Sequence, residues 1–228
     1  MQQKAKEEKA IILDFLPNGY AIDTRPMHMK TAIAQALGKE HFILLELVPK
    51  KGIFLQPNEE VYMGEGKREK IHHIVGRIPF EKLTQTARIS LEQWVEKTVS
   101  DNEKKFVSFF NTAAPINTRR HQIELVPGVG KKHMWEIIEE REKKQFESFV
   151  DIKARVRLMP DPKKAIIKRI LMEIKGEDKY RIFVGMWRKS KWNVYKLIHT
   201  NVYKCYLKMG ARIEKFILQE LKASKKAS

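Results

Sequence analysis

Cysteine is almost absent from this sequence of 228 residues, since Cys205 is the only one. A single cysteine cannot form a disulfide within the chain, and it cannot supply the several thiolates of a cysteine-based zinc site. No stretch approaches the roughly 18 consecutive apolar residues of a membrane-spanning helix, and residues 1–9 lack the apolar core of a signal peptide. We therefore expect a cytoplasmic protein without a membrane span.

Acidic residues are far fewer than basic ones. The chain has 28 Asp and Glu against 45 Lys and Arg, which gives a net charge of +17 and a pI near 9.8. Such a charge attracts nucleic acid or an anionic membrane surface. The excess is uneven, because residues 185–228 hold 11 Lys and Arg against 2 Asp and Glu. We expect this segment to be a basic helical extension that strongly affects any salt-dependent affinity.

Short apolar stretches separated by turn residues predict a small β-rich domain over residues 10–80. We expect strands at residues 10–15, 20–22, 42–48, 61–63 and 71–78, and a short helix at residues 31–37 closed by Gly38. Five or so short strands with one helix fit a small barrel, and an OB-like barrel is the version that we favour. Residues 1–9 are expected to be a flexible N-terminus.

Apolar residues recur at spacings of three and four across residues 81–184, which predicts a second, all-helical domain. The best defined helices span residues 86–99, 103–110 and 165–174. Asn117 or Thr118 is expected to cap a further helix. The predicted fold class is therefore α+β with two domains, an OB-like β-barrel followed by an all-α domain.

A glycine-containing turn stands out within the helical domain. Leu125 is followed by Val-Pro-Gly-Val-Gly and then by Lys131 and Lys132, after which a helical pattern resumes. A helix, Pro-Gly-Val-Gly and a second helix, in this order, resemble the helix-hairpin-helix motif of nucleic-acid-binding proteins that do not read sequence. We place this motif at about residues 117–142.

The residue types of this turn suit a phosphate. Gly128 and Gly130 can take a positive φ and lack a Cβ, so a sugar-phosphate strand can approach their backbone, while Val129 packs inward. The amides that open the next helix have no partner inside it and lie at the positive end of its dipole. Lys131 and Lys132 add two cations there. The alternative is a tight helix-helix turn that has no ligand.

A second helix-turn-helix, at about residues 149–175, occupies the place of a second hairpin but lacks the Gly-x-Gly. We expect it to complete the helical core and to extend the basic face of the domain. The further nucleic-acid contacts predicted there are Lys163, Lys164, Lys168 and Arg169.

An OB-like barrel offers loops and a strand face where basic residues hold phosphates and aromatic rings stack on bases. The candidates are Arg25, Lys30, Lys50, Lys51, Lys67, Arg68, Lys70, Arg77, Tyr20 and Tyr62, of which Lys67 and Arg68 are retained as binding residues. For each one, a solvated lysine or a core tyrosine is the competing interpretation. His72 and His73 are adjacent on a predicted strand and are expected on opposite faces, which argues against a shared metal ion. No metal site and no cofactor are predicted.

Catalysis is not expected. Asp151 has a loose likeness in its surroundings to the catalytic Asp of helix-hairpin-helix DNA glycosylases, but Ser148 to Asp151 also fits a helix start that the carboxylate would cap. The sequence has no iron-sulfur cysteines, no Gly-x-x-x-x-Gly-Lys-Ser/Thr loop and no credible nucleophile-base pair. The sequence therefore favours a binding protein over an enzyme.

Beyond the hairpin, the sequence carries Leu13-Asp14-Phe15-Leu16-Pro17, Leu44 to Pro49, Val61 to Gly66, Phe109 to Ala113 and Tyr180 to Phe183. In this order they resemble an uncharacterised archaeal family whose members join an OB-like barrel to a helix-hairpin-helix domain. The likeness runs from about Lys9 to Val184, and residues 185–228 depart from it. It implies nucleic-acid binding, with RNA favoured because the family is associated with translation genes, and it implies no reaction.

The sequence thus predicts a non-catalytic nucleic-acid-binding protein, with ribosomal or other translation components as further partners. One alternative is a DNA-binding accessory protein of repair or replication, and another is an adaptor whose basic face meets an acidic protein. For residues 185–228, a basic amphipathic helix on RNA, on an acidic partner or on a membrane surface competes with an extension that has no specific ligand.

Overall fold

The computed structural model describes residues 7–21, 24, 26 and 30–185. Arg25 and all but the first residue of the predicted basic extension lie outside the described residues. Glu7 falls in the segment expected to be flexible, yet it is buried, and its carboxylate accepts hydrogen bonds from the backbone N–H groups of Glu40 and His41. Contacts with the body of the protein thus begin ahead of the first strand.

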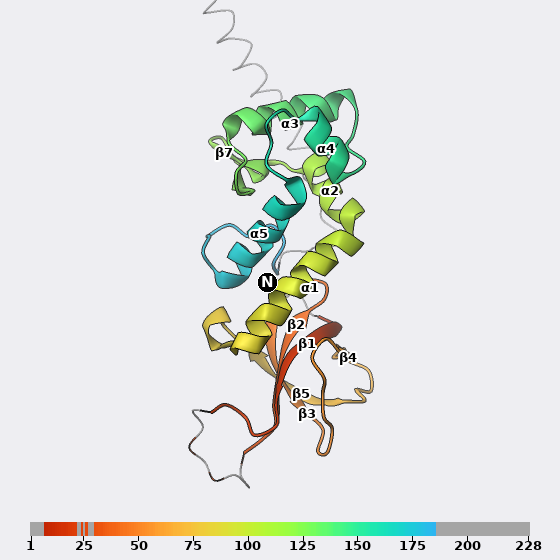
Figure 1. The fold of residues 1–228 in the computed structure, drawn as a ribbon, viewed down its shortest axis with the longest axis vertical. Coiled ribbons are helices and arrows are strands. Elements are labelled where there is room, and N and C mark those ends of the chain that lie inside the picture. The colour runs from red at the N-terminus through yellow and green to blue at the C-terminus, as the bar shows by residue number, and fades with distance from the viewer. Residues whose placement is uncertain (1–6, 22–23, 25, 27–29, 186–228) are drawn as a thin grey trace, which may run out of the picture. The chain divides into compact units, whose positions relative to one another are not determined.

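Five strands come first in the chain and helices follow them (Figure 1). The five strands are β1 (Lys9–Leu16), β2 (Ile33–Gly38), β3 (Leu44–Pro49), β4 (Glu60–Tyr62) and β5 (Ile71–Arg77). The helical part that follows contains the 3₁₀ helices η2 (Phe80–Lys82) and η3 (Gln122–Leu125) and the helices α1 (Gln85–Asp101), α2 (Glu103–Thr112), α3 (Lys131–Lys143), α4 (Phe149–Arg155) and α5 (Pro162–Lys175). It also contains a two-stranded hairpin of β6 (Pro115–Asn117) and β7 (Arg120–His121). The predicted α+β class is confirmed. None of these helices is long and apolar enough to span a membrane.

The five strands form one antiparallel sheet in the order β4-β1-β2-β3-β5. The sheet curls into a half-barrel, with β4 and β5 at its two edges (Figure 1). Its strands share a core of buried apolar side chains, among them Ile12, Leu45, Leu47, Val61 and Ile71. The strands predicted at residues 10–15, 42–48, 61–63 and 71–78 are confirmed as β1, β3, β4 and β5.

The helix expected at residues 31–37 is wrong, because Ile33–Gly38 form β2. Helical propensity is a weak preference that tertiary pairing overrides, and β2 is hydrogen-bonded to β1 on one side and to β3 on the other. Ala34 to Gly38 are all buried, so this central strand lacks the alternation that marks a half-exposed strand. Gly38 is not a helix cap, because it is the last residue of β2. A Cβ there would lie 2.1 Å from a carboxylate oxygen of Glu7.

The return strand expected at residues 20–22 is also wrong, because β2 is the strand that returns along β1. Tyr20 lies outside any strand, and its hydroxyl donates a hydrogen bond to Glu46 of β3 at 2.7 Å. Burial, and next this hydrogen bond to a carboxylate, raise the pKa of Tyr20 to about 12. The ring that was a candidate for base stacking is thus tied to the sheet through its hydroxyl.

A polar joint connects the start of α1 to the sheet. The side-chain oxygen of Thr84 accepts a hydrogen bond from the N–H of Ala87 at 3.1 Å, and its hydroxyl donates to Asp14 of β1. Gln35, buried in β2, accepts the N–H of Thr84 and donates to the carbonyl of Lys82. Beyond this joint, α1 contacts β1 and α5, so the sheet and the helices belong to one compact unit.

We predict that Thr84→Ala lowers the free energy of unfolding by about 1 to 2 kcal/mol, because it removes the cap of α1 and the bond to Asp14 together. Thr86→Ala, at an exposed position of the first turn, is the matched control and should change it by less than about 0.5 kcal/mol. Urea unfolding measures both. Equal losses in the two variants would mean that the joint does not stabilise the fold.

Candidate functional site

The segment that leads into the Pro-Gly-Val-Gly turn is not the helix expected from Asn117 or Thr118. Asn117 ends β6, Arg120 begins β7, and the chain then makes only the single 3₁₀ turn η3. The side chain of Asn117 accepts a hydrogen bond from the N–H of Arg119 at 2.9 Å, a local turn that competes with a helix. The cap lies further on, where His121 closes the start of η3.

Residues 126–130 form a turn that two buried valines hold in place. Val126 and Val129 are 1% and 5% exposed, and the N–H of Val129 donates to the carbonyl of Val126 at 3.0 Å. The expectation that Val129 packs inward is confirmed. Gly128 has a φ of +82°, and a Cβ there would lie 2.8 Å from Cγ of Pro160. Both the backbone conformation and the close approach of Pro160 therefore require glycine at this position.

Neither of the two reasons for glycine at position 128 applies at Gly130. Its φ is −87°, not the positive value considered from the sequence, and a Cβ there would face open space. Gly130 is the N-cap of α3, and no side chain in the described residues caps this helix. Side chains cap α1, α4 and α5, whereas α2 also lacks a side-chain cap but has Glu103 in its first turn. The first turn holds no acidic residue, and Lys131 and Lys132 are exposed in it. The positive end of the α3 dipole thus meets no negative charge from its own first turn.

The turn, the start of α3 and the hairpin of β6 and β7 line one cleft of about 1060 Å³. Residues 117–120 and 124–131 supply most of its lining. Arg119 and Arg120 from the hairpin and Lys131 from α3 bring positive charge to it from two elements. Two carboxylates line the cleft as well, but Glu124 accepts the N–H of His121 and Asp178 accepts from Arg169. Cations from two elements thus line the same cleft as the start of α3.

Arg119 and Arg120 were missed as site residues. Two consecutive arginines after the turn-forming pair Asn117-Thr118 were a signal for a basic turn, but the segment was interpreted as a helix start. Arg120 also lies over the ring of Tyr180, with its guanidinium carbon 5.5 Å from the ring centroid. This contact holds the base of the hairpin against the segment that follows α5.

Arg169 is not part of an exposed basic face, so its predicted role as a surface phosphate contact is wrong. Its side chain is 1% exposed and lies within a network of hydrogen bonds at the edge of the cleft. It donates to Glu173 and to Asp178, both at 2.7 Å, and to the carbonyl of Tyr180. The hydrogen bond from Arg169 lowers the pKa of Asp178 below its usual value. The guanidinium therefore satisfies internal acceptors rather than a ligand.

Glu173 extends this network to the end of the described chain. Its buried carboxylate accepts hydrogen bonds from the N–H groups of Ile182, Phe183 and Val184, at 2.8 to 3.0 Å. Phe183 in turn packs edge-on against Phe106 of α2, with ring centroids 5.7 Å apart. The carboxylate thus fixes residues 182–184 against the helices.

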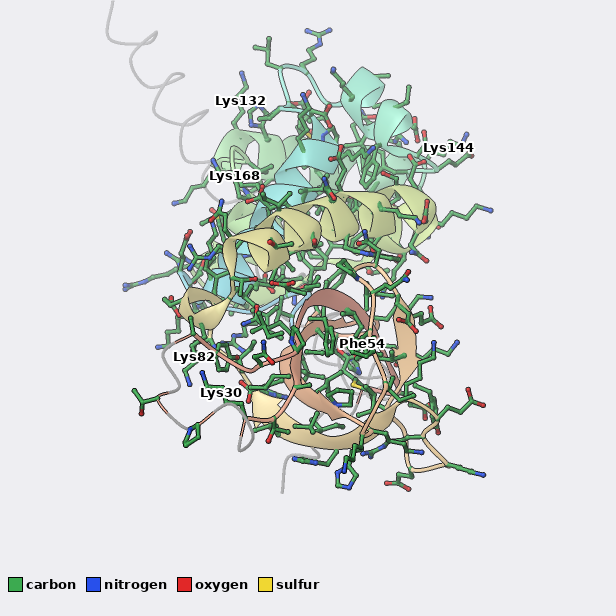
Figure 2. The ribbon with its side chains drawn as sticks, turned by 60° about the horizontal axis from the view of Figure 1, so that its bottom comes forward. Lys30, Phe54, Lys82, Lys132, Lys144 and Lys168 are labelled. Carbon is green, nitrogen blue, oxygen red and sulfur yellow. The ribbon has the colours of Figure 1, made fainter. Side chains whose placement is uncertain are left out.

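The other predicted cations of α5 lie on its surface. Lys164 and Lys168 are exposed and Lys163 is half-buried, and none of the three lines the cleft. Lys132 and Lys168 project from the same side of the helical part in Figure 2, and Lys144 projects from the opposite side. The three α5 lysines therefore do not build the cleft, and Lys168 lies on the same side of the helical part as Lys132.

Lys67 and Arg68 belong to the loop between β4 and β5, and they do not line the cleft either. Arg68 donates to the carbonyl of Gly64 at 3.0 Å, and its own carbonyl accepts from Lys50 at 2.5 Å. The loop also folds over the ring of Tyr62, whose hydroxyl accepts the N–H of Gly66 at 3.3 Å. The hydrogen bonds of this loop therefore tie it to the sheet, and no described contact joins Lys67 or Arg68 to the cleft.

His72 and His73 do not point to opposite faces, and that expectation is wrong. Their Nδ1 atoms are 2.8 Å apart. The pairing of β5 with β3 shifts here, from Val48 opposite His73 to Pro49 opposite Ile71, so His72 is the extra residue of a β-bulge. The described residues contain no group of three or more His, Cys, Asp or Glu side chains placed to hold a metal.

Asp151 lies at the start of α4, as the helix-start interpretation predicts. Its N–H donates to the hydroxyl of Ser148 at 3.1 Å, and its carboxylate accepts the N–H of Glu147 at 3.1 Å. The same carboxylate is 3.4 Å from Arg155, four residues along the helix. The Oδ2 atom of Asp151 therefore has structural partners within the helix and just before it.

The fold and the cleft together define an α+β protein in which a curled antiparallel sheet precedes helices with a cationic cleft. Residues 6–185 match the model of DUF655, a family described as proteins of unknown function, and the chain belongs to this family. It is 44% identical over 186 residues to the uncharacterized protein MJ0038 of Methanocaldococcus jannaschii, over 81% of this chain and 82% of the relative. The crystal structure of Af1531 from Archaeoglobus fulgidus, of family DUF655, superposes with a TM-score of 0.69 at 45% identity, over 78% of this chain and 99% of that one. The resemblance to an uncharacterised archaeal family is thereby confirmed.

We predict that Arg169→Met lowers the free energy of unfolding by about 3 to 5 kcal/mol, because it leaves the buried Glu173 carboxylate without its cation. Lys168→Met, one residue earlier and exposed, is the control and should cost less than about 0.5 kcal/mol. Chemical denaturation gives both values. An Arg169→Met protein as stable as the parent would contradict the structural role and restore Arg169 as a candidate ligand contact.

Proposed function

We propose that this protein binds nucleic acid without catalysing a reaction, and that RNA is its main ligand. The observation that carries the proposal is the uncapped start of α3, where open amides, Lys131 and the arginines of the β6–β7 hairpin line one cleft. The net charge of +17 supports a polyanionic ligand. The preference for RNA, and for translation components as partners, rests on the association of the resembled family with translation genes.

A phosphate in this cleft would supply what the start of α3 lacks. The first N–H groups of a helix have no partner inside it, and the helix dipole adds about half a positive charge at that end. Lysines at this end disfavour an isolated helix by a few tenths of a kcal/mol, a cost that a bound phosphate reverses. Contacts of this kind position a nucleic-acid backbone and do not read its sequence.

We interpret this region as a helix-hairpin-helix whose first helix is reduced to the 3₁₀ turn η3. The tight turn, its two buried valines and the long helix α3 support this interpretation. The half-barrel of five short antiparallel strands, open between β4 and β5, supports an OB-like first domain. On this interpretation Lys67 and Arg68 belong to a second nucleic-acid surface on the barrel, and residues 185–228 add charge.

The sharpest test of the site is Gly130→Asp, which places a carboxylate on the amides proposed for the phosphate. Aspartate is a good N-cap, and the site has open space for its Cβ, so the folded state should be as stable as the parent or more stable by a few tenths of a kcal/mol. Affinity for an RNA stem-loop should fall about 10- to 100-fold, because the hydrogen bonds from these amides to a charged phosphate are lost. Fluorescence anisotropy and thermal unfolding measure the two effects.

Gln145→Asp is the matched control, since it makes the same change of charge at an exposed position beyond the other end of α3. Its affinity should change less than about threefold, because the added charge is solvated and screened. Equal weakening by the two variants would mean that net charge, and not the start of α3, controls binding. Unchanged affinity in Gly130→Asp would remove this turn from the interface.

Salt dependence tests the lysines of α3. Lys132→Gln should reduce the slope of log affinity against log salt by about 0.9 on duplex DNA, and by about 0.7 on a single strand, if Lys132 neutralises one phosphate. Lys144→Gln is the control, because Lys144 pairs with Glu147 at 3.0 Å and projects from the opposite side (Figure 2). A slope that falls equally in both variants would contradict a localised site.

The contribution of the basic extension to nucleic-acid affinity is measured with a chain that ends at Gly185. This deletion removes 11 Lys and Arg against 2 Asp and Glu, so the salt slope should fall by several units while binding to the cleft persists. Titrations from 50 to 300 mM salt, on matched RNA and DNA, give the slope and the preferred polymer. Complete loss of binding in a folded truncated chain would make the extension the main binding element.

A further inference from the structure

The turn between α4 and α5 resembles the turn at residues 126–130 in its burial and in one backbone angle. Met159 is 6% exposed, as Val129 is 5% exposed in the first turn. Leu158 precedes Met159 with a φ of +56°, and Gly128 precedes Val129 with a φ of +82°. The buried Val156 and Val126 each stand two residues before the left-handed position. The two turns therefore share this pattern, although the second one lacks glycine and has one more residue, Pro160, before the N-cap of its helix.

The second turn cannot hold a phosphate as the first one would. Its helix, α5, begins behind Asp161, whose carboxylate accepts the N–H of Lys164 at 3.1 Å. Pro162 occupies the first helical position and has no N–H to offer. The anion site at the start of α5 is thus filled by the protein's own carboxylate, so the second turn must differ in function from the first.

Leu158 is the unusual residue of this second turn. A left-handed backbone conformation disfavours a branched side chain, and Gly or Asn would adopt it at less cost. The side chain of Leu158 offsets none of that cost by packing, since it is 89% exposed. The two other non-glycine residues with positive φ in the described chain do have partners, because Phe42 is buried and Asn58 accepts a hydrogen bond from Trp94. Folding alone therefore gives no reason for leucine at position 158.

The two turns touch each other. Cγ of Pro160 lies 2.8 Å from the point where a Cβ of Gly128 would stand, so the turns pack backbone against ring. Leu158 is two residues from Pro160, which keeps their Cα atoms within about 7 Å. An exposed leucine thus lies on the turn that packs against the turn leading into α3.

We propose that Leu158 is a wedge that enters between stacked base pairs beside the phosphate held at the start of α3. The ligand class is therefore double-helical nucleic acid, such as an RNA stem. Apolar side chains inserted between base steps unstack and kink a duplex, and leucine is one of the residues used. A single strand would instead be met by an aromatic platform, which leucine does not provide. This inference rests on the proposed function and adds to it the form of the ligand.

The test uses the full chain and an RNA stem-loop that carries 2-aminopurine at successive positions of the stem, with the same strand unpaired as a comparison. The parent protein should bind the stem more tightly and raise 2-aminopurine fluorescence at one step. Leu158→Asn, which suits the left-handed backbone, should melt at no lower temperature than the parent. It should also lose the fluorescence signal and bind the stem about tenfold more weakly, as expected for the loss of one buried leucine.

Two further variants test whether the effect depends on an apolar side chain and on its position at residue 158. Leu158→Met keeps an apolar wedge and should keep both the signal and the affinity. Val150→Asn removes an apolar side chain that is 76% exposed on α4, and it should change neither.

Three results would overturn the wedge. Parent-like fluorescence and affinity in Leu158→Asn would do so, and if Gly130→Asp still lost binding the proposed function would stand. Tighter binding of the unpaired strand would exclude the duplex as ligand and again leave nucleic-acid binding intact. No binding of either RNA or DNA by the full chain would end both proposals, and an acidic protein would become the partner to test.

Discussion

Arg169 and Glu173 lie one turn apart on α5, and their buried ion pair holds the side of the cleft that Arg169 and Asp178 line. The guanidinium holds Asp178 and the carbonyl of Tyr180, and the ring of Tyr180 lies under Arg120 of the β6–β7 hairpin. The carboxylate holds the backbone of residues 182–184. A buried charge that loses its partner costs several kcal/mol, so this pair acts as a fixed frame. Arg169 is used inside the protein. A cation such as Arg120, which the contact with Tyr180 positions, remains for a ligand.

The N-cap residue decides which of the two packed turns can hold an anion. Both turns bury an apolar residue after a left-handed one, and both lead into a helix whose first turn carries two lysines. The N-cap differs, since Gly130 leaves the start of α3 open and Asp161 closes the start of α5. An open start next to cations suits a phosphate, and a closed start does not. The pair of turns would thus combine one phosphate contact with one apolar contact to the same duplex.

Local sequence patterns predicted β1, β3, β4, β5 and most helices to within a few residues, because turn residues bound each apolar stretch. They failed for β2, where pairing with strands on both sides overrides helix-forming alanines. The turn at residues 126–130 was predicted from its glycines, but the cleft also needs Arg119, Arg120 and residues 169–178, which only tertiary packing brings together. Arg169 follows Lys168 and so looked like a surface cation. The acceptors that bury it, Glu173 and Asp178, are four and nine residues away.

The central claim is that the amides at the start of α3 hold a phosphate of the ligand. Backbone amide chemical shifts, followed by NMR while an RNA stem-loop is added to the full chain, test it most directly. The account predicts saturable shifts at Gly130, Lys131 and Lys132, with much smaller ones at Lys163 and Lys164, because Asp161 already occupies the start of α5. Shifts confined to the sheet, or equal shifts at the starts of both helices, would contradict it.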